Sequence, residues 1–403
     1  MIPLDDARAR IDRDISQLPS VLTPIGESSG LVLDETIVAS ESMPPFANTA
    51  MDGFAVHAID LAGASEDSPV RLPVAGTIPA GSVATHPLAP GTTMRIMTGA
   101  PLPEGADAVI MVELSRPVDD EFIDLIAEVP TGNHVRPAGD DLREGDVVFA
   151  AGTVITPAHV GILASLGRES VRCIRRPRVG VFSTGDELVV GPVALQPGQI
   201  RDSNRPGLLA AVTQAGFDAV DLGLLPDDEA IITAALNDAV RRCDVLLTTG
   251  GVSMGDFDFV KIVLGKLGDF NWMQVAIRPA KPLAFGIIDE TPVFGLPGNP
   301  VSSMVSFELF AKPALRKMMG LPKGPGTIIG LADEPFLRHP DGKTHFVRVQ
   351  AKQEADGAWR VRSAGEQGSH QLSAMAAANA LAVLPDGDGV AAGGALKIML
   401  LNS

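Results

Sequence analysis

The sequence predicts a multi-domain protein in which an α/β domain is combined with β-rich regions. Its 403 residues suffice for two to four domains of roughly 100–200 residues each. Between about residues 172 and 320, strand and helix signals alternate, which favours a mostly parallel sheet covered by helices. Residues 70–112 are short apolar pieces broken by Pro and Gly, and residues 325–403 hold further short apolar runs. The expected fold class is therefore multi-domain α/β plus β.

The elements of the α/β region follow from local signals. In chain order, we expect a strand at 178–183, a helix capped by residues 202–204 and running to 215, a helix from 227 to about 242, a strand at 244–248, a helix ending near 267, strands near 283–288 and 293–296, and a helix at 301–319. Asn299 is the expected N-cap of the last helix and Pro300 its first residue.

Outside this region the expected elements are fewer. Thr156 and Pro157 start a helix that ends at Gly167. Four alternating runs predict strands in the last quarter of the chain: 346–349, 359–362, 381–384 and 396–399.

Composition excludes several classes of protein. The formal charge of −17 repels nucleic acid and acidic membranes, and Tyr is absent, so stacking on bases is disfavoured. No apolar run reaches about 18 residues, and residues 1–15 lack the pattern of a signal peptide. Cys173 and Cys243 fall just before expected strands and lack metal-ligand spacing, which is typical of buried free thiols. We expect a soluble, cytoplasmic protein.

The glycine-rich segment 248–258 is the strongest chemical signal. It follows the apolar run 245–247 and precedes Lys261. Glycines after a strand allow positive φ and let backbone N–H groups converge on an anion. Two carboxylates, Asp256 and Asp258, could hold a divalent cation against phosphates. The alternative is an ordinary turn in which Asp only caps the next helix.

Acidic residues recur where an α/β sheet places its ligands, at strand carboxyl ends and helix starts. They occupy four places: Asp186 with Glu187, Asp202, Asp227 with Asp228, and Asp256 with Asp258. Each alone can be a helix cap that contributes about 1 kcal/mol. Four at one edge exceed what capping needs, so together they favour a metal-assisted site.

Positive charge is concentrated in residues 278–282, where prolines bracket Arg278 and Lys281. Such a pair can be positioned in advance for an oxyanion; the alternative is a solvated basic turn. By their chemistry alone, residues 44–55 are consistent with a packed inter-domain crossing and residues 139–145 with an Asp-rich turn.

Taken in order, these segments resemble the MoeA family of molybdopterin molybdenumtransferases, which is related to the E domain of gephyrin. The resemblance rests on residues 45–55 (PFANTAMDGFA), 139–141 (GDD), 184–188 (TGDEL), 202–204 (DSN), 249–258 (TGGVSMGDFD), 281–282 (KP) and 295–302 (GLPGNPVS). The motifs follow the family order across nearly the whole chain.

The resemblance implies a fold with four parts. These are a discontinuous small domain (1–55 and 139–170), an inserted β-rich domain (56–138), a three-layer α/β/α pterin-binding domain (171–324) and a C-terminal β-barrel (325–403). It also implies a homodimer, with transient contact to the adenylyltransferase of the pathway and to molybdoenzyme acceptors.

The resemblance implies that the protein inserts molybdenum from molybdate into adenylylated molybdopterin, with release of AMP and the help of Mg²⁺. Three groups of site residues are implied by position. The first are catalytic acids, of which the last three would hold the metal: Asp52, Asp141, Glu187, Asp228 and Asp258. The second bind the pterin substrate: Thr249, Gly250, Gly251, Ser253, Gly255, Lys261, Pro297, Gly298, Asn299, Pro300 and Ser302. The third contact molybdate: Arg278, Lys281, Pro282, Arg348 and one of Ser369 or Ser373.

Two other functions remain open at this stage. One is a scaffold that binds a pterin or a protein partner without catalysis. The other is an adenylyltransferase that makes the adenylylated pterin, which would consume ATP without molybdate.

Overall fold

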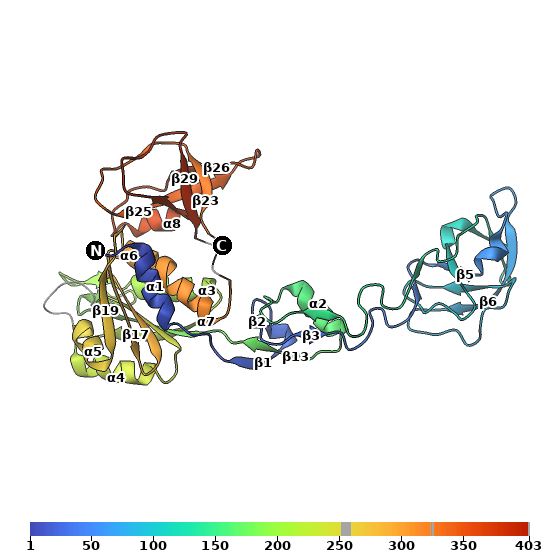
Figure 1. Ribbon diagram of the computed structural model, residues 1–403, viewed down its shortest axis with the longest axis horizontal. Coiled ribbons are helices and arrows are strands. Elements are labelled where there is room, and N and C mark those ends of the chain that lie inside the picture. The colour runs from blue at the N-terminus through green and yellow to red at the C-terminus, as the bar shows by residue number, and fades with distance from the viewer. Residues whose placement is uncertain (251–258, 323, 325, 402–403) are drawn as a thin grey trace. The chain divides into compact units, whose positions relative to one another are not determined.

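The computed structural model describes residues 1–250, 259–322, 324 and 326–401. The chain forms two compact units (Figure 1). The first comprises residues 1–23, 28–34 and 172–403, and the second comprises residues 24–27 and 35–171.

A six-stranded sheet forms the centre of the first unit, in the order β17-β14-β18-β22-β21-β19. The strands are β17 (Asp218–Leu225), β14 (Arg178–Thr184), β18 (Val245–Thr249), β22 (Thr291–Leu296), β21 (Pro282–Ile288) and β19 (Asp269–Gln274). The first four run parallel, while β21 and β19 pair antiparallel at one edge. The expected mostly parallel sheet is confirmed.

Helices cover both faces of this sheet, so the domain has three layers (Figure 1). On one face α4 (Glu229–Ala239) and α5 (Phe259–Leu267) close an apolar core that includes Phe182, Leu246 and Val293. On the other, α3 (Asn204–Gln214) packs on β14 and β17 and against α6 (Pro300–Ser306). Buried apolar residues on α4 and α5 account for this packing, which confirms the expected α/β/α arrangement.

Several elements differ from expectation. The predicted helix at 301–319 is α6, a π-helical segment at Phe307–Ala311 and then α7 (Lys312–Met318). The elements that were not predicted include α1 (Leu4–Asp14), β13 (Ser170–Ile174), β17 and β19. The last two are the sheet's edge strands, half-exposed and interrupted by polar side chains, so they lack an apolar run. Cys173 lies within β13, ahead of the predicted strand β14, and both cysteines are buried and form no disulfide among the described residues.

Five strands near the C-terminus close into a barrel. They are β23 (Ile328–Ala332), β25 (Thr344–Gln353), β26 (Trp359–Ser363), β27 (Ala380–Leu384) and β29 (Ala395–Leu400), and the pairing of β25 with β27 closes the ring. Their inward side chains form one apolar core around Val349, Val361 and Ile398. A two-residue strand, β20 (Ile277–Arg278), pairs with β25 in parallel. The C-terminal β-barrel is confirmed.

The second unit is built mainly from a β-sheet with the order β8-β5-β7-β6-β10-β9. Its strands are β5 (Gly53–Val56), β6 (Val70–Ile78), β7 (Thr93–Ile96), β8 (Ala108–Met111), β9 (Ser115–Pro117) and β10 (Phe122–Leu125). In the same unit, α2 (Pro157–Ser165) starts where expected, with a capping box between Thr156 and His159. Among the residues described in either unit, no helix has the length and apolar character needed to cross a bilayer.

Candidate functional site

The carboxyl end of β18 is shaped for close approach by a ligand. Thr249 is buried, and Gly250 follows with φ of +90°. A Cβ added at Gly250 would lie 2.9 Å from the carbonyl oxygen of Thr184, at the end of neighbouring β14. Both facts require glycine here. The next predicted residues of the loop, Gly251, Ser253 and Gly255, lie outside the described residues.

Asn204 joins the β18 loop to the loop that precedes α6. Its side-chain Nδ2 donates to Thr249 Oγ1 at 2.8 Å and to the carbonyl oxygen of Gly298 at 2.7 Å. Its Oδ1 is buried without a hydrogen-bond partner. Asn204 was expected as part of a helix cap, but its side chain instead ties together two loops that carry predicted binding residues. The DSN motif contained this residue, and only the geometry reveals its role.

The start of α6 places a third group of predicted residues at the same edge. Asn299 is the N-cap and Pro300 the first residue, as expected, although the Asn299 side chain makes no capping hydrogen bond. The carbonyl oxygen of Pro297 accepts a hydrogen bond from Thr249 Oγ1 at 3.4 Å. Ser302 is buried in the first turn. Residues 297–302 therefore adjoin the β18 loop.

Two of the four groups of acidic residues expected from the sequence are in contact in the structure, the one at residues 186–187 and the one at residues 227–228. Asp186 Oδ1 accepts a hydrogen bond from the backbone N–H of Asp227 at 3.2 Å. Burial raises the pKa of Asp227, and the charges of Asp186 and Glu187 raise it further. The Glu187 carboxylate folds back so closely over Gly185 that a Cβ there would lie 2.6 Å from its Oε2.

Asp228 caps a helix, since its side chain accepts the N–H of Ile231 at 2.9 Å at the start of α4. Asp258, the third predicted metal ligand, lies outside the described residues. Within the ranges that the structure describes, no three His, Cys, Asp or Glu side chains are grouped so that they could hold a metal ion.

Asp202 takes no part in the acidic cluster. Its side chain is 1% exposed and pairs with Arg205 Nε at 2.9 Å, while Ser183 Oγ donates to it at 3.0 Å. Arg205 also contacts Asp221 on β17. The sequence interpretation missed this compensating arginine, so one of the four acidic places is structural.

Lys261, predicted to bind substrate, lies on α5 with its ammonium 5.5 Å from the Trp272 ring.

A cavity of about 610 Å³ opens in the first unit, and Arg278 and Arg348 are among its lining residues. The Arg348 side chain is completely buried on β25, and none of the carboxylates in the described ranges pairs with it. Its Nη2 donates to the carbonyl oxygens of Glu366 and Gly368, whereas its Nε has no partner. Burial lowers the pKa of Arg348. A buried cation without a counter-ion is costly, so this arrangement suits an anionic ligand.

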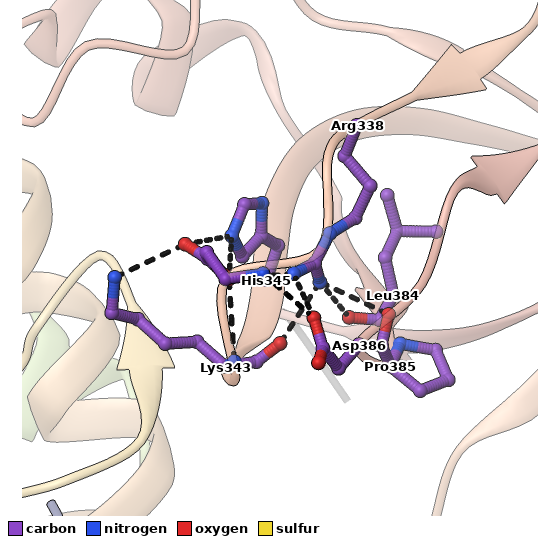
Figure 2. A network of polar contacts seen from close by, with 7 residues as sticks. Arg338, Lys343, His345, Leu384, Pro385 and Asp386 are labelled. Carbon is purple, nitrogen blue, oxygen red and sulfur yellow. Dashed lines mark hydrogen bonds and ion pairs between the residues drawn. The ribbon is translucent and has the colours of Figure 1, made fainter.

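One wall of the cavity is held by the polar network in Figure 2. Arg338 donates to the carbonyl oxygens of Lys343, Leu384 and Pro385 and to the carboxylates of Asp341 and Asp386. His345 Nε2 contacts Asp341 at 3.1 Å. Burial lowers the pKa of His345, and the charges of Arg338 and Arg278 lower it further, against the opposing effect of the contact with Asp341. The network fixes the segment that faces Arg278, whose strand position is paired with His345.

The other predicted oxyanion residues are not among those that line this cavity, within the described part of the chain: Lys281, Pro282, Ser369 and Ser373. Lys281 is exposed and follows Ala280, which has φ of +71°. The carbonyl oxygen of Ser369 accepts the N–H of Val301 at 3.1 Å, so Ser369 adjoins the start of α6. Ser373 lies exposed on α8 (Leu372–Ala377).

Asp52 and Asp141 belong to the second unit, and both are exposed. Thr98 donates to Asp52 from its hydroxyl at 2.6 Å and from its backbone N–H at 2.7 Å, and these bonds lower the pKa of Asp52. Arg95, which lies 5.0 Å from the Phe54 ring centroid, lowers it further. Thr98 carried no sequence signal, because it is 46 residues away from Asp52 and meets it only through the pairing of β5 and β7.

Comparison with known proteins gives matches along nearly the whole chain. Three family descriptions match: MoeA N-terminal region (domain I and II) at residues 2–167, probable molybdopterin binding domain at 180–317, and MoeA C-terminal region (domain IV) at 336–401. The chain is 40% identical over 388 residues to molybdopterin molybdenumtransferase 2 of Mycobacterium tuberculosis, covering 94% of each chain. It is 38% identical over 410 residues to the molybdopterin molybdenumtransferase of Haemophilus influenzae, covering 100% of this chain and 99% of the relative. A crystal structure of the molybdopterin biosynthesis moeA protein from Pyrococcus horikoshii OT3 matches with a TM-score of 0.81 and 30% identity, covering 99% of this chain and 100% of that one.

Proposed function

The chain belongs to the MoeA family of molybdopterin molybdenumtransferases, and from that premise we propose the form of its substrates and the place of each in the structure. The protein inserts molybdenum into molybdopterin in the biosynthesis of the molybdenum cofactor. We propose that the metal arrives as molybdate, that the pterin is adenylylated, that AMP is released and that Mg²⁺ assists.

The phosphates of the adenylylated pterin would bind at the carboxyl end of β18. The positive φ of Gly250 and the lack of space for a Cβ there support close approach of a ligand to the backbone. Asn204 Oδ1, buried and unpaired beside Thr249, is an acceptor that a bound substrate could satisfy. The proposed contacts are Thr249, Gly250, Gly251, Ser253, Gly255, Lys261, Pro297, Gly298, Asn299, Pro300 and Ser302.

Mg²⁺ would be held by Glu187 and Asp228 together with Asp258. Carboxylate oxygens are the ligands that this cation prefers. Burial, and then the charges of Asp186 and Glu187, raise the pKa of Asp227 nearby, and a cation here would offset that repulsion. When bound, the cation would neutralise charge on the substrate phosphates.

Molybdate would bind at the buried guanidinium of Arg348, the observation on which this part of the proposal depends. Arg348 has no carboxylate partner in the described chain and shares a cavity with Arg278, so a dianion would supply the missing counter-charge. We assign Lys281, Pro282 and Ser369 to the same substrate. Ser369 is preferred to Ser373 because its backbone contacts α6, whereas Ser373 is exposed.

Hydrogen bonds join the two proposed sites within the first unit. Arg348 donates to Gly368, whose neighbour Ser369 accepts from Val301 at the start of α6. The preceding loop is tied to the β18 loop through Asn204. Oxyanion and phosphate sites connected in this way suit a reaction in which the metal enters a phosphate-bearing pterin.

Asp52 and Asp141 are proposed to position substrate or to handle protons.

AMP release tests this reaction. The purified protein should release AMP from adenylylated molybdopterin only when molybdate and Mg²⁺ are both present, and chelation of the metal should stop it. Asp258→Ala should lower the rate about 100-fold or more if Asp258 helps to neutralise the phosphates. Asp269→Ala, an exposed acid on β19, is the matched control and should be unchanged. Molybdate-independent AMP release, or binding without release, would contradict the proposal, and ATP consumption would indicate an adenylyltransferase.

Gly250→Ala should weaken AMP binding at least about 10-fold. The φ of +90° costs a side chain roughly 1–2 kcal/mol, and the contact of 2.9 Å with the Thr184 carbonyl oxygen forces the loop to move. Gly223→Ala is the matched control, because Gly223 has φ of +86° with nothing within 4 Å of its Cβ position. Calorimetric titration with AMP should separate the two variants. Equal affinities would show that the close approach at Gly250 has no part in binding.

We further propose a cytoplasmic homodimer that has no nucleic-acid or membrane partner and makes transient contact with the pathway's adenylyltransferase and with molybdoenzyme acceptors. The charge of −17 supports the exclusion of nucleic acid.

A further inference from the structure

Arg348 lies on β25 at a position that is paired with one neighbouring strand of the barrel, β27, but not yet with the other, β26. On one side β25 pairs with β27, with Arg348 opposite Leu381. On the other side the pairing with β26 begins one residue later, at Val349 and Ser363. On that side, the carbonyl oxygen of Arg348 accepts the N–H of Ala364 at 3.0 Å, whereas the N–H of Arg348 needs a partner from outside the strand.

The side chain of Gln367 supplies the partner of that N–H and adds a second hydrogen bond to the carbonyl oxygen. Its Oε1 accepts the N–H of Arg348 at 2.9 Å, and its Nε2 donates to the carbonyl oxygen of Arg348 at 3.1 Å. The same Nε2 donates to the carbonyl oxygen of Gly365 at 2.8 Å. One amide thus satisfies the N–H of Arg348 and also fixes its own loop.

The residues on either side of Gln367 hold the other end of the arginine. The carbonyl oxygens of Glu366 and Gly368 accept from Arg348 Nη2 at 2.8 and 3.1 Å. The backbone and the guanidinium of Arg348 are therefore both held by one three-residue segment, which leaves Nε unpaired. Gln367 and Arg348 both line the cavity.

We propose that Gln367 is the positioning residue that fixes the Arg348 guanidinium for its oxyanion, an inference that rests on the proposed function. Without the Gln367 amide, segment 366–368 loses its two hydrogen bonds to the Arg348 backbone, and the two carbonyl oxygens that orient the guanidinium lose their fixed place. Gln367 itself need not touch the oxyanion.

The test is calorimetric titration of the full-length protein with molybdate, in parallel with titration by AMP. Gln367→Ala should weaken molybdate binding about 10- to 100-fold, the range for residues that orient a ligand-contacting side chain, while AMP binding stays unchanged. Gln367→Glu keeps the length of the side chain and one acceptor but loses the donor to two carbonyl oxygens, and should show the same selective loss. A general folding defect would weaken both ligands, so equal losses for molybdate and AMP in both variants would overturn the proposal.

Gln350→Ala is the matched control. Gln350 lies on the same strand but contacts Arg362 and the carbonyl oxygen of Ala377, neither of which lines the cavity. Its molybdate affinity should equal that of the unmodified protein.

A double-mutant cycle separates this inference from the proposed function. If Gln367 acts through Arg348, adding Gln367→Ala to Arg348→Ala should cause no further loss of molybdate binding. Additive losses would overturn the positioning role. If Arg348→Ala alone binds molybdate normally, the proposed oxyanion site fails. If Arg348→Ala loses binding and both Gln367 variants bind normally, the Gln367 inference alone fails.

Discussion

Replacing Arg348 with alanine is expected to remove most of the protein's affinity for molybdate. The guanidinium is completely buried, has one unpaired N–H and meets no carboxylate in the described chain. Losing one partner of a buried charged pair costs roughly 2–5 kcal/mol of binding free energy, which corresponds to a loss of about 30- to 5,000-fold. Calorimetric titration with molybdate measures this loss, and molybdate-dependent AMP release should fall with it.

Arg362→Ala is the control for Arg348→Ala. Arg362 lies exposed on the neighbouring strand β26 and is bonded to Gln350, so its removal should leave molybdate affinity unchanged. Arg348→Lys keeps the charge but loses the planar, forked donors, and its affinity should lie between those of the unmodified protein and the alanine variant. Normal molybdate binding by Arg348→Ala would show that the buried cation serves another purpose.

The fold was predictable where the sequence carries uninterrupted apolar runs. Central strands β14, β18 and β22 are buried on both faces and were expected close to their observed places. Edge strands β17 and β19 were missed, because neither is a fully buried apolar run: acids stand at two positions of β17, and polar or exposed residues alternate along β19. Closure of the C-terminal strands into a barrel was expected from the family resemblance, since the pairing of β25 with β27 leaves no local signal.

The candidate site was predictable as a set of motifs but not as a geometry. Glycine spacing indicated the β18 loop, and the positive φ of Gly250 agrees with it. The hydrogen bonds of Asn204 and Gln367 could not be derived, because each joins segments that only folding brings together. The number of acidic residues was misleading at Asp202, because its charge is balanced by Arg205 in the first turn of α3.

Arg205→Ala is expected to destabilise the first unit by about 3–5 kcal/mol, the usual cost of leaving one member of a buried ion pair without its partner. Asp202 is 1% exposed, and Arg205 provides its counter-ion at 2.9 Å. Asp202 also holds Ser183 at the end of β14, and α3 begins with Asn204, which ties the two proposed binding loops. Urea unfolding followed by circular dichroism should show the loss, and AMP affinity should decrease together with stability.

The cause of that loss can be isolated with two further variants. Arg242→Ala removes an exposed pair with Asp238, whose side chains are 51% and 65% exposed, and should cost no more than about 1 kcal/mol. Adding Asp202→Asn to Arg205→Ala removes the unpaired charge while keeping an acceptor for Ser183, and should recover part of the stability. If the double variant is no more stable than Arg205→Ala, the loss comes from packing of the arginine stem. Asp202 and Arg205 would then act by filling space beneath the proposed binding loops, and the charge of the Asp202 carboxylate would not help to hold α3 in place.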